Sequence, residues 1–305
     1  MAYSAETRRA AVAAVKAGAS IASVARALGA NKDHIAKWCK DPEKWCGESK
    51  DELAQRMLGA AKPEPTPAIF QPVAEPTENI VLVIPDLHCP FEHPDALEFL
   101  KAVQAAKGTN KNVCLGDELD AHALSRYPHD PDGMSPGDEM RKGREHLYPF
   151  YQAFPEMLVC ESNHTVRGHK LANTSGVPSM FLRSIETVLN YPDGWKLAGA
   201  HVIDGVKYIH GDAGRSGQYA HIHYMRQAKQ PIVIGHIHAF AGVSYEGDLF
   251  AMNTGCLINP EAYAFAYARK ALVPVSLGCG VVYGGRRAEF IPMELNADGR
   301  WTGRL

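Results

Sequence analysis

Residues 80–88 read IVLVIPDLH, and this stretch decides the fold that we expect. Five apolar residues, 80–84, form an unbroken run that Pro85 ends, which is typical of a strand buried on both faces. Asp86 and His88 follow directly after the run. In layered α/β proteins, ligands collect at the carboxyl ends of such strands. The stretch therefore predicts a buried strand whose end presents a carboxylate and an imidazole.

The same arrangement recurs four more times along the chain. In each case a short apolar segment leads to Asp, Asn or His. The segments and their polar residues are 113–115 with Asp117 and Asp120, 157–160 with Asn163 and His164, 206–209 with His210, and 232–234 with His236 and His238. If these five strand ends converge, they build a cluster of oxygen and imidazole donors. Mixed donors of this kind suit manganese, iron or zinc better than magnesium or calcium alone.

Taken in order, the five blocks resemble the motifs of the calcineurin-like metallophosphoesterases, which are DxH, GDxxD, GNH, a lone H and GHxH. They stand here as Asp86-Leu87-His88, Gly116-Asp117-Glu118-Leu119-Asp120, Ser162-Asn163-His164, His210, and Gly235-His236-Ile237-His238. The resemblance covers most of residues 79–294. It implies an α/β fold, a four-layer α/β/β/α sandwich with two mixed sheets between helices. It also implies hydrolysis of phosphate esters with two divalent metal ions.

The resemblance further implies a role for each matching residue. Asp117 would bridge the two ions. The other ligands would be Asp86, His88 and His238 for the first ion, and Asn163, His210 and His236 for the second. His164 would act as general acid or transition-state stabiliser, and Asp120 would hold its imidazole. Apart from the resemblance, Arg167 lies close after His164 and is a candidate to bind phosphate, with Arg215 as a weaker candidate. Manganese is the first expectation, with iron, zinc, nickel or magnesium as alternatives.

Two positions depart from the family pattern. Ser162 stands where the family has glycine, and Thr165 stands where an acid often follows the histidine. Neither position is a metal ligand in the family pattern. The departures therefore leave the expected metal site intact and put the subfamily in doubt.

A proline-rich stretch separates this region from a smaller N-terminal piece. Five prolines lie within residues 62–77, and proline excludes both a helix and a central strand there. We therefore expect three parts: a helical domain at 1–48, an extended linker at 49–78 and the phosphoesterase domain at 79–305.

The N-terminal piece is expected to form three short helices, capped by Ser4, Ser20 and Asn31. The apolar positions Ala10, Val12, Val15 and Ala17 predict the buried side of the first helix, and those of the second and third are Ile21, Val24, Ala25, Leu28, Ile35 and Trp38. The pattern resembles the helix-turn-helix of transposases and recombinases.

In a helix-turn-helix domain the third helix enters the major groove of DNA. The expected contact residues are Asn31, Lys32, His34 and Lys37. Residues 1–40 hold seven basic and two acidic residues, which suits contacts with phosphate. The alternative is a small bundle used for oligomerisation or partner binding, whose charges are solvated. A homodimer is left open.

Three functions remain open at this point. The first is a DNA phosphodiesterase, a nuclease or repair enzyme brought to DNA by the N-terminal domain. The second is a phosphomonoesterase or small phosphodiesterase acting on a nucleotide or phosphoprotein, with the same site residues. The third is a DNA-binding regulator whose phosphoesterase fold is a scaffold. That reading predicts lost ligands, but all seven ligand positions and His164 are present. The sequence of residues 210–256 also resembles phosphoesterases encoded by bacteriophages and prophages.

Composition limits the partners and the cellular compartment that we expect for the protein. The 305 residues carry a formal net charge of −2, so nucleic-acid binding requires a local basic face. The seven cysteines are scattered without a CxxC pair, which predicts free thiols and a reducing cytoplasm. The chain has no apolar run of about 18 residues, so we expect no membrane span.

Further elements are expected from the pattern of the large region. Helices are expected at 94–105 and 137–151, and strands at 242–245, 249–253, 280–283 and 288–292. The first half of residues 125–145 is expected to form a loop over the active-site face. His221 and His223 are expected on a helix, in solvated or capping roles rather than as metal ligands.

Overall fold

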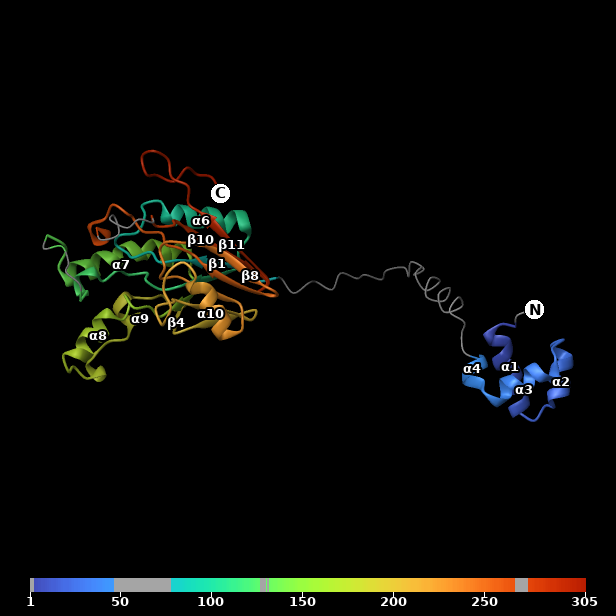
Figure 1. The fold of residues 1–305 in the computed structure, drawn as a ribbon. Coiled ribbons are helices and arrows are strands. Elements are labelled where there is room, and N and C mark those ends of the chain that lie inside the picture. Colours follow the sequence, from blue (N-terminus) through green and yellow to red (C-terminus); the bar gives the residue numbers. More distant parts are fainter. Residues whose placement is uncertain (1–2, 47–77, 127–129, 131, 267–273) are drawn as a thin grey trace. The chain divides into compact units, whose positions relative to one another are not determined.

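The computed structural model describes residues 3–46, 78–126, 130, 132–266 and 274–305 (Figure 1). The chain divides into two compact units, residues 1–73 and 74–305, and each is described by itself. The expected linker at 49–78 lies outside the described residues, apart from Glu78.

The small unit is helical. Its helices are α1 (Ala5–Lys16), α2 (Ile21–Ala27), α3 (Lys32–Lys40) and α4 (Pro42–Cys46). The first three begin as the sequence predicts, because the side chains of Ser4, Ser20 and Asn31 each accept a backbone N–H from the following turn.

The core of the small unit corrects one expectation. Val24, Ile35 and Trp38 are buried as predicted, but on α1 Ala5 and Ala11 are buried while Ala10 and Ala17 are exposed. Helix α4, which the sequence pattern did not reveal, also packs against α1. Arg8 and Arg9 are used in this contact, since they donate to the backbone oxygens of Trp45 and Cys46.

The large unit contains two mixed sheets. The first has the strand order β11-β10-β1-β2-β3-β4, and the second has the order β5-β6-β7-β9-β8. The bounds in the first sheet are β1 Ile80–Ile84, β2 Lys111–Cys114, β3 Met157–Cys160, β4 Trp195–Ala198, β10 Gly278–Tyr283 and β11 Arg287–Pro292. The bounds in the second are β5 His201–Ile203, β6 Val206–Ile209, β7 Ile232–Ile234, β8 Gly242–Glu246 and β9 Leu249–Asn253.

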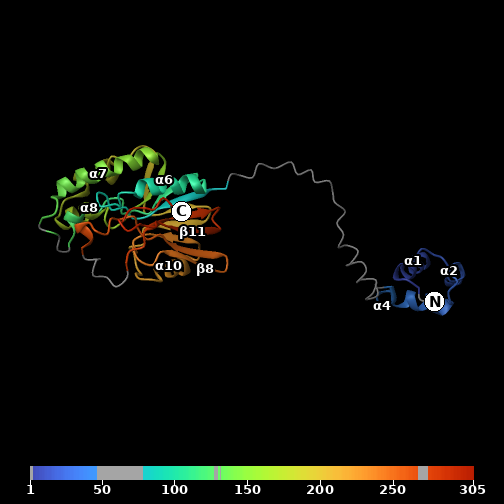
Figure 2. The ribbon, with the colours of Figure 1, turned by 90° about the horizontal axis from the view of Figure 1, so that it is seen from above.

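Helices cover the outer faces of the two sheets (Figures 1 and 2). Helices α6 (Ala96–Lys107) and α7 (Pro136–Ala153) pack on the first sheet, and α10 (Ala220–Ala228) packs on the second. This mixed α/β arrangement is consistent with the four layers expected from the sequence. The strands expected at 242–245, 249–253, 280–283 and 288–292 are confirmed as β8 to β11.

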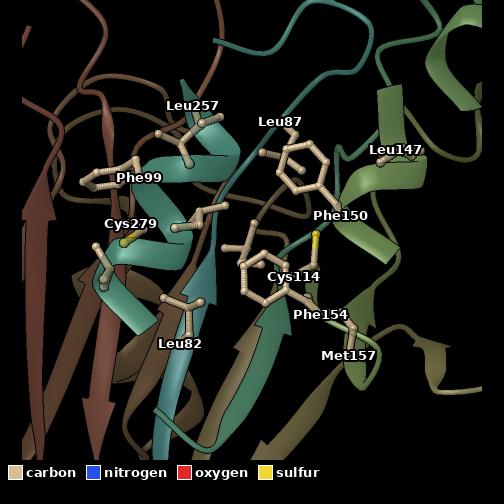
Figure 3. Close-up of a cluster of buried hydrophobic side chains, with 14 of the residues drawn as sticks. Leu82, Leu87, Phe99, Cys114, Leu147, Phe150, Phe154, Met157, Leu257 and Cys279 are labelled. Carbon is tan, nitrogen blue, oxygen red and sulfur yellow. The ribbon is translucent and has the colours of Figure 1, made fainter. Parts of the chain in front are cut away.

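Alternation along β1 explains how the layers hold together. Leu82 and Ile84 face α6 and α7, whereas Val81 and Val83 face the second sheet. Figure 3 shows the helix side, where Phe99 of α6 and Phe150 of α7 lie against the strands. Burying one such side chain stabilises the fold by roughly 1.5–3 kcal/mol. Because both faces of β1 are buried, its polar residues can lie only at its ends.

The remaining elements connect the layers. The short helices are α8 (Arg167–Thr174) and α9 (Ile185–Leu189), and the 3-10 turns are η1 (His122–Leu124), η2 (Ser179–Phe181) and η3 (Tyr263–Phe265). The loop expected over the site is described only in part, since 127–129 and 131 lie outside the described residues. On α10, His221 is buried against Ser244 rather than solvated, while His223 is exposed.

Two expectations from composition can be compared with the described residues. All seven cysteines are free thiols, as expected. None of the helices in the described part of the chain combines the length and the apolar composition needed to span a bilayer.

Candidate metal centre

The five polar blocks lie at the carboxyl ends of neighbouring parallel strands. In the first sheet, β1, β2 and β3 run parallel, with Ile84 opposite Cys114 and Cys114 opposite Val159. In the second sheet β6 and β7 are parallel, with Ile209 opposite Ile234. The strands therefore end level with one another, and the side chains that follow them converge.

Three groups of donor side chains result, and each could hold a metal ion. Within a group, the donor atoms lie within 4.8 Å of one another. The groups are Asp86 with His88 and His238, His88 with Asp120 and His164, and Asp117 with His210 and His236. Together with Asn163, which lies beside His210, the structure brings together all seven ligands that the sequence predicts.

The first half of the cluster contains Asp86, His88 and His238. The Nδ1 atom of His88 lies 2.6 Å from an oxygen of Asp120. Since a carboxylate only accepts, Nδ1 donates, and the lone pair of His88 Nε2 faces the cluster. His238 Nε2 lies 3.2 Å from both His88 Nε2 and Asp86 Oδ2. Donor atoms about 3 Å apart fit around one ion whose bonds to nitrogen are about 2.1 Å long.

The second half is built in the same way. His210 Nδ1 donates to the backbone oxygen of Leu115 at 3.0 Å, so its Nε2 faces inward. That Nε2 lies 2.9 Å from Asn163 Oδ1 and 3.3 Å from Asp117 Oδ2. The ring of His236 lies beside the ring of His210, with their centroids 5.0 Å apart. Nitrogen and oxygen donors therefore meet here as they do in the first half.

Asp117 lies between the two halves. Its Oδ2 is 3.5 Å from His88 Nε2 and 3.3 Å from His210 Nε2. Burial raises the pKa of Asp117, but the charges of His210 and His164 outweigh burial and hold that pKa well below its usual range. Asp117 is therefore ionised, in a position to face cations on both sides.

The backbone at the cluster adopts an uncommon conformation. Three residues have positive φ angles, which are 53° at His88, 47° at Asp117 and 65° at His236. These values lie in the left-handed region of the backbone, which residues other than glycine rarely adopt. Each such residue costs about 1–3 kcal/mol, and such residues gather at functional sites. Hydrogen bonds hold them in place: His88 N–H donates to Asp117 O at 2.7 Å, and His236 N–H to Asp86 Oδ2 at 2.9 Å.

The residues present fit a cation. Asp86 Oδ1 is buried and has no hydrogen-bond partner among the described residues, although an unpaired buried carboxylate oxygen is costly. The glycine of the GHxH block keeps the space beside it clear, because a Cβ on Gly235 would lie 2.4 Å from Asp86 Oδ1. A metal ion would supply the partner that the protein does not.

Three further residues surround His164. Its Nδ1 donates to the backbone oxygen of Asp120 at 2.7 Å, and the Asp120 carboxylate lies 3.1 Å away. The same carboxylate is closer to His88, so Asp120 serves both imidazoles rather than His164 alone. The guanidinium of Arg167 donates to His164 Nε2 at 2.7 Å and to the backbone oxygens of Asp120 and Ala121.

The pKa values around His164 follow from these contacts. Burial lowers the pKa of His164, but Asp117 and Asp120 outweigh burial, and the net shift is upward. Burial raises the pKa of Asp120, and its hydrogen bonds with His164 and His88 reverse the shift and hold that pKa well below its usual value. Asp120 therefore remains an ionised anchor for both imidazoles.

The two departures from the family pattern form one hydrogen-bond chain. Ser162 Oγ accepts the backbone N–H of Asp117 at 2.9 Å and lies 2.6 Å from Thr165 Oγ1. Thr165 Oγ1 in turn contacts the buried carboxylate of Glu118 at 3.2 Å, which the hydroxyl of Tyr191 also contacts. Ser162 and Thr165 thus act together, since they tie the Asn-His loop to the backbone of Asp117.

Sequence reasoning missed several residues that position the cluster. Asn253, at the end of β9, donates from its side-chain amide to the backbone oxygens of Ile237 and Ala239 and so supports the GHxH loop. Glu139 of α7 accepts the backbone N–H groups of His122 and Ala123, just after Asp120. No local motif marks either residue; the only signal was a polar side chain in an otherwise buried position.

Comparison with known proteins identifies no family for this chain. No family model and no curated protein matches the chain. Solved structures that resemble it include Vacuolar Protein Sorting 29 from Cryptosporidium parvum, with 12% identity, 70% of this chain and 97% of that chain covered, and a TM-score of 0.38. Vps29 complexed with zinc from Entamoeba histolytica has 14% identity, coverages of 70% and 98%, and a TM-score of 0.33.

The phosphoesterase YfcE from E. coli has 15% identity, coverages of 70% and 100%, and a TM-score of 0.33. Likeness at this level carries no argument about function. The chemistry of this site therefore rests on its own residues.

Proposed function

We propose that the large unit is a two-metal phosphoesterase that hydrolyses phosphate esters. The observation that carries this proposal is the position of Asp117. Its Oδ2 lies within 3.5 Å of His88 Nε2 on one side and 3.3 Å of His210 Nε2 on the other. Two neighbouring cations repel each other, and a carboxylate that contacts both lowers this repulsion. A two-metal site needs such a shared ligand.

The ligands divide between two ions, and Asp117 belongs to both. Asp86, His88 and His238 would hold one, and Asn163, His210 and His236 the other. When bound, two divalent ions lower the pKa of a water molecule and neutralise phosphate oxygens. The mixture of imidazole, carboxylate and amide donors favours manganese, iron or zinc.

His164 and Arg167 would act on the ester itself. A leaving oxygen needs a proton, and His164 Nε2 is the half-buried nitrogen at the edge of the cluster that can supply one. In this structure Arg167 occupies that nitrogen. A phosphate group would attract the guanidinium, since paired N–H donors match phosphate oxygens. Substrate binding would thereby free His164 Nε2 to take up a proton, which the raised pKa of His164 favours. The imidazolium would then give that proton to the leaving oxygen.

DNA is the substrate that we infer. The support comes from the small unit, where Lys32, His34 and Lys37 are exposed on α3 and the N-cap residue Asn31 is exposed just before it. The buried side chains of α3 are Ile35 and Trp38, so its polar residues face outward. A helix of this kind suits the major groove, where lysines contact phosphates. The enzyme would then be a DNA phosphodiesterase.

The test is hydrolysis, with manganese, of bis-p-nitrophenyl phosphate, p-nitrophenyl phosphate, and single- and double-stranded DNA. Asp117→Asn and His164→Ala serve as site variants, and Lys32→Glu/Lys37→Glu as the α3 variant. The proposal expects the diester and DNA to be cut, with the α3 variant impaired on DNA alone. Cleavage of the monoester alone, with DNA untouched at low salt, would overturn the DNA assignment and favour a small phosphatase.

A further inference from the structure

The segment 167–183 follows the Asn-His block in the sequence and carries exposed apolar side chains. It contains α8, η2 and the residues between them (Figure 1). Its first residue, Arg167, contacts His164. Farther along, Met180 and Phe181 are 83% and 73% exposed, and Leu171 and Val177 are also exposed. Large apolar side chains that are exposed to water often belong to a surface that binds another molecule.

The charge of this segment points to a polyanion. Residues 166–185 contain no Asp or Glu, whereas Arg167, Lys170 and Arg183 are basic. Within the part of the chain that the structure describes, neither Lys170 nor Arg183 forms an ion pair. Both side chains are exposed. The segment therefore combines cations that are not neutralised with exposed apolar side chains.

A single strand of nucleic acid matches this combination better than a duplex does. A single strand offers phosphates to the cations and unpaired base faces to the apolar side chains, whereas a duplex hides its base faces. An acidic protein surface would satisfy the cations but would offer fewer flat apolar groups.

A cavity also lies between this segment and the loop after β2. Its volume is about 200 Å³, and its lining includes His169 and Arg183 of the segment, Leu119 and Ala121 of the loop, and Met140 of α7 and Val188 of α9. Leu119 and Ala121 flank Asp120 in the sequence. An apolar cavity at this place can receive a group that enters from a strand lying on the segment.

We propose that residues 167–183 bind single-stranded nucleic acid and lead its phosphates to the metal centre. Phe181 and Met180 stack on bases, Lys170 and Arg183 contact phosphates, and Arg167 meets the phosphate nearest His164. This inference rests on the proposed phosphoesterase function and defines the form of its substrate.

The experiment measures binding separately from hydrolysis. Full-length Met180→Ala/Phe181→Ala protein is titrated with a fluorescent thymidine oligonucleotide in EDTA, and Val202→Ala is the control. Val202 is 63% exposed on the edge strand β5. The expected Kd increase is about tenfold for the double variant, from lost stacking, and none for the control. Hydrolysis of bis-p-nitrophenyl phosphate with manganese should be unchanged in both proteins.

Charge is tested by Lys170→Ala and Arg183→Ala. Each should reduce the slope of log K against log salt by about 0.7, as expected for one lost contact with a single-strand phosphate. The same titrations in a Lys32→Glu/Lys37→Glu background remove any contribution from α3.

The outcomes separate the two proposals. If the double variant binds the oligonucleotide as tightly as the wild type, or if the wild type does not bind it at low salt, the inference is overturned. Self-association that the double variant abolishes, seen by sedimentation, would also overturn it in favour of a second copy of the chain. Binding as expected without diester hydrolysis would support the surface and overturn the proposed activity.

Discussion

The candidate functional residues are buried in the large unit of this protein and exposed in the small unit. In the large unit, Asp86, His88 and Asp117 are buried and face one another across a few ångströms. In the small unit, Lys32 and Lys37 are exposed and face water. Burying several ionisable groups together is costly unless something binds them. Exposed lysines need no partner, so the DNA contact proposed for them is tested by binding rather than by burial.

The largest expected effect comes from removing the bridging charge. Asp117→Asn keeps the shape of the side chain but leaves two cations without a shared carboxylate. We expect hydrolysis of bis-p-nitrophenyl phosphate to fall by about a thousandfold. Asp248→Asn, an exposed aspartate in the turn between β8 and β9, is the matched control and should retain full activity. Activity of Asp117→Asn near that of the control would refute the bridging role.

A smaller effect is expected from the hydrogen-bond chain behind the bridge. Thr165→Val preserves the size of the side chain but removes the contacts with Ser162 and Glu118. We expect manganese affinity to fall about tenfold, as for other residues that orient metal ligands. Thr165→Ser keeps the hydroxyl and should restore the affinity, which calorimetric titration can measure. If serine is as poor as valine at this position, packing rather than hydrogen bonding is the cause.

The small unit should respond in a different assay. Lys32→Glu/Lys37→Glu should weaken duplex DNA binding and reduce its salt slope by about 0.9 for each lost phosphate contact. Hydrolysis of bis-p-nitrophenyl phosphate should not change, since the substitutions lie in the other unit. Anisotropy titrations over a range of salt concentrations measure the slope. Unchanged duplex affinity would leave the bundle as an oligomerisation or partner-binding module.

The smallest effect is a dependence of metal binding on pH. Burial lowers the pKa of His210, but the carboxylates of Asp117, Asp86 and Asp212 together outweigh burial and raise the pKa to about 10. The stability that this proton contributes is complete below pH 6.5 and is lost as the pH rises toward about 10. Manganese must displace the proton, because both occupy the same nitrogen lone pair.

Manganese should therefore raise the melting temperature more at higher pH. Thermal unfolding with and without manganese, at pH values from about 6.5 upward, measures this difference. A manganese-induced shift that stays constant or shrinks over that range would contradict the competition between proton and metal.

The contrast between the units also explains what the sequence could predict. The polar residues at the strand ends could be predicted, because an apolar strand buried on both faces can carry a polar residue only at its end. Asp86, which follows the strand that ends at Ile84, is an example. The caps Ser4, Ser20 and Asn31 were readable because capping is a local interaction. Helix α4 could not be predicted from the sequence pattern, although it packs against α1.

Residues that act through distant backbone contacts escaped sequence reasoning as well. Asn253 supports the GHxH loop from another strand, and Glu139 holds the turn after Asp120 from α7. Nothing near them in the sequence marks these roles, because the partners meet only when the layers assemble. The same is true of Ser162 and Thr165, which looked like two separate departures and form one hydrogen-bond chain.

The most direct test of the account is a calorimetric titration of the EDTA-treated full chain with manganese, with diester hydrolysis assayed along the same titration. The account predicts two bound ions per chain and hydrolysis that rises as the sites fill. In Asp117→Asn, both the paired binding and the hydrolysis should be lost. A wild-type chain that binds no metal ion, or that hydrolyses the diester equally well in EDTA, would contradict the central claim.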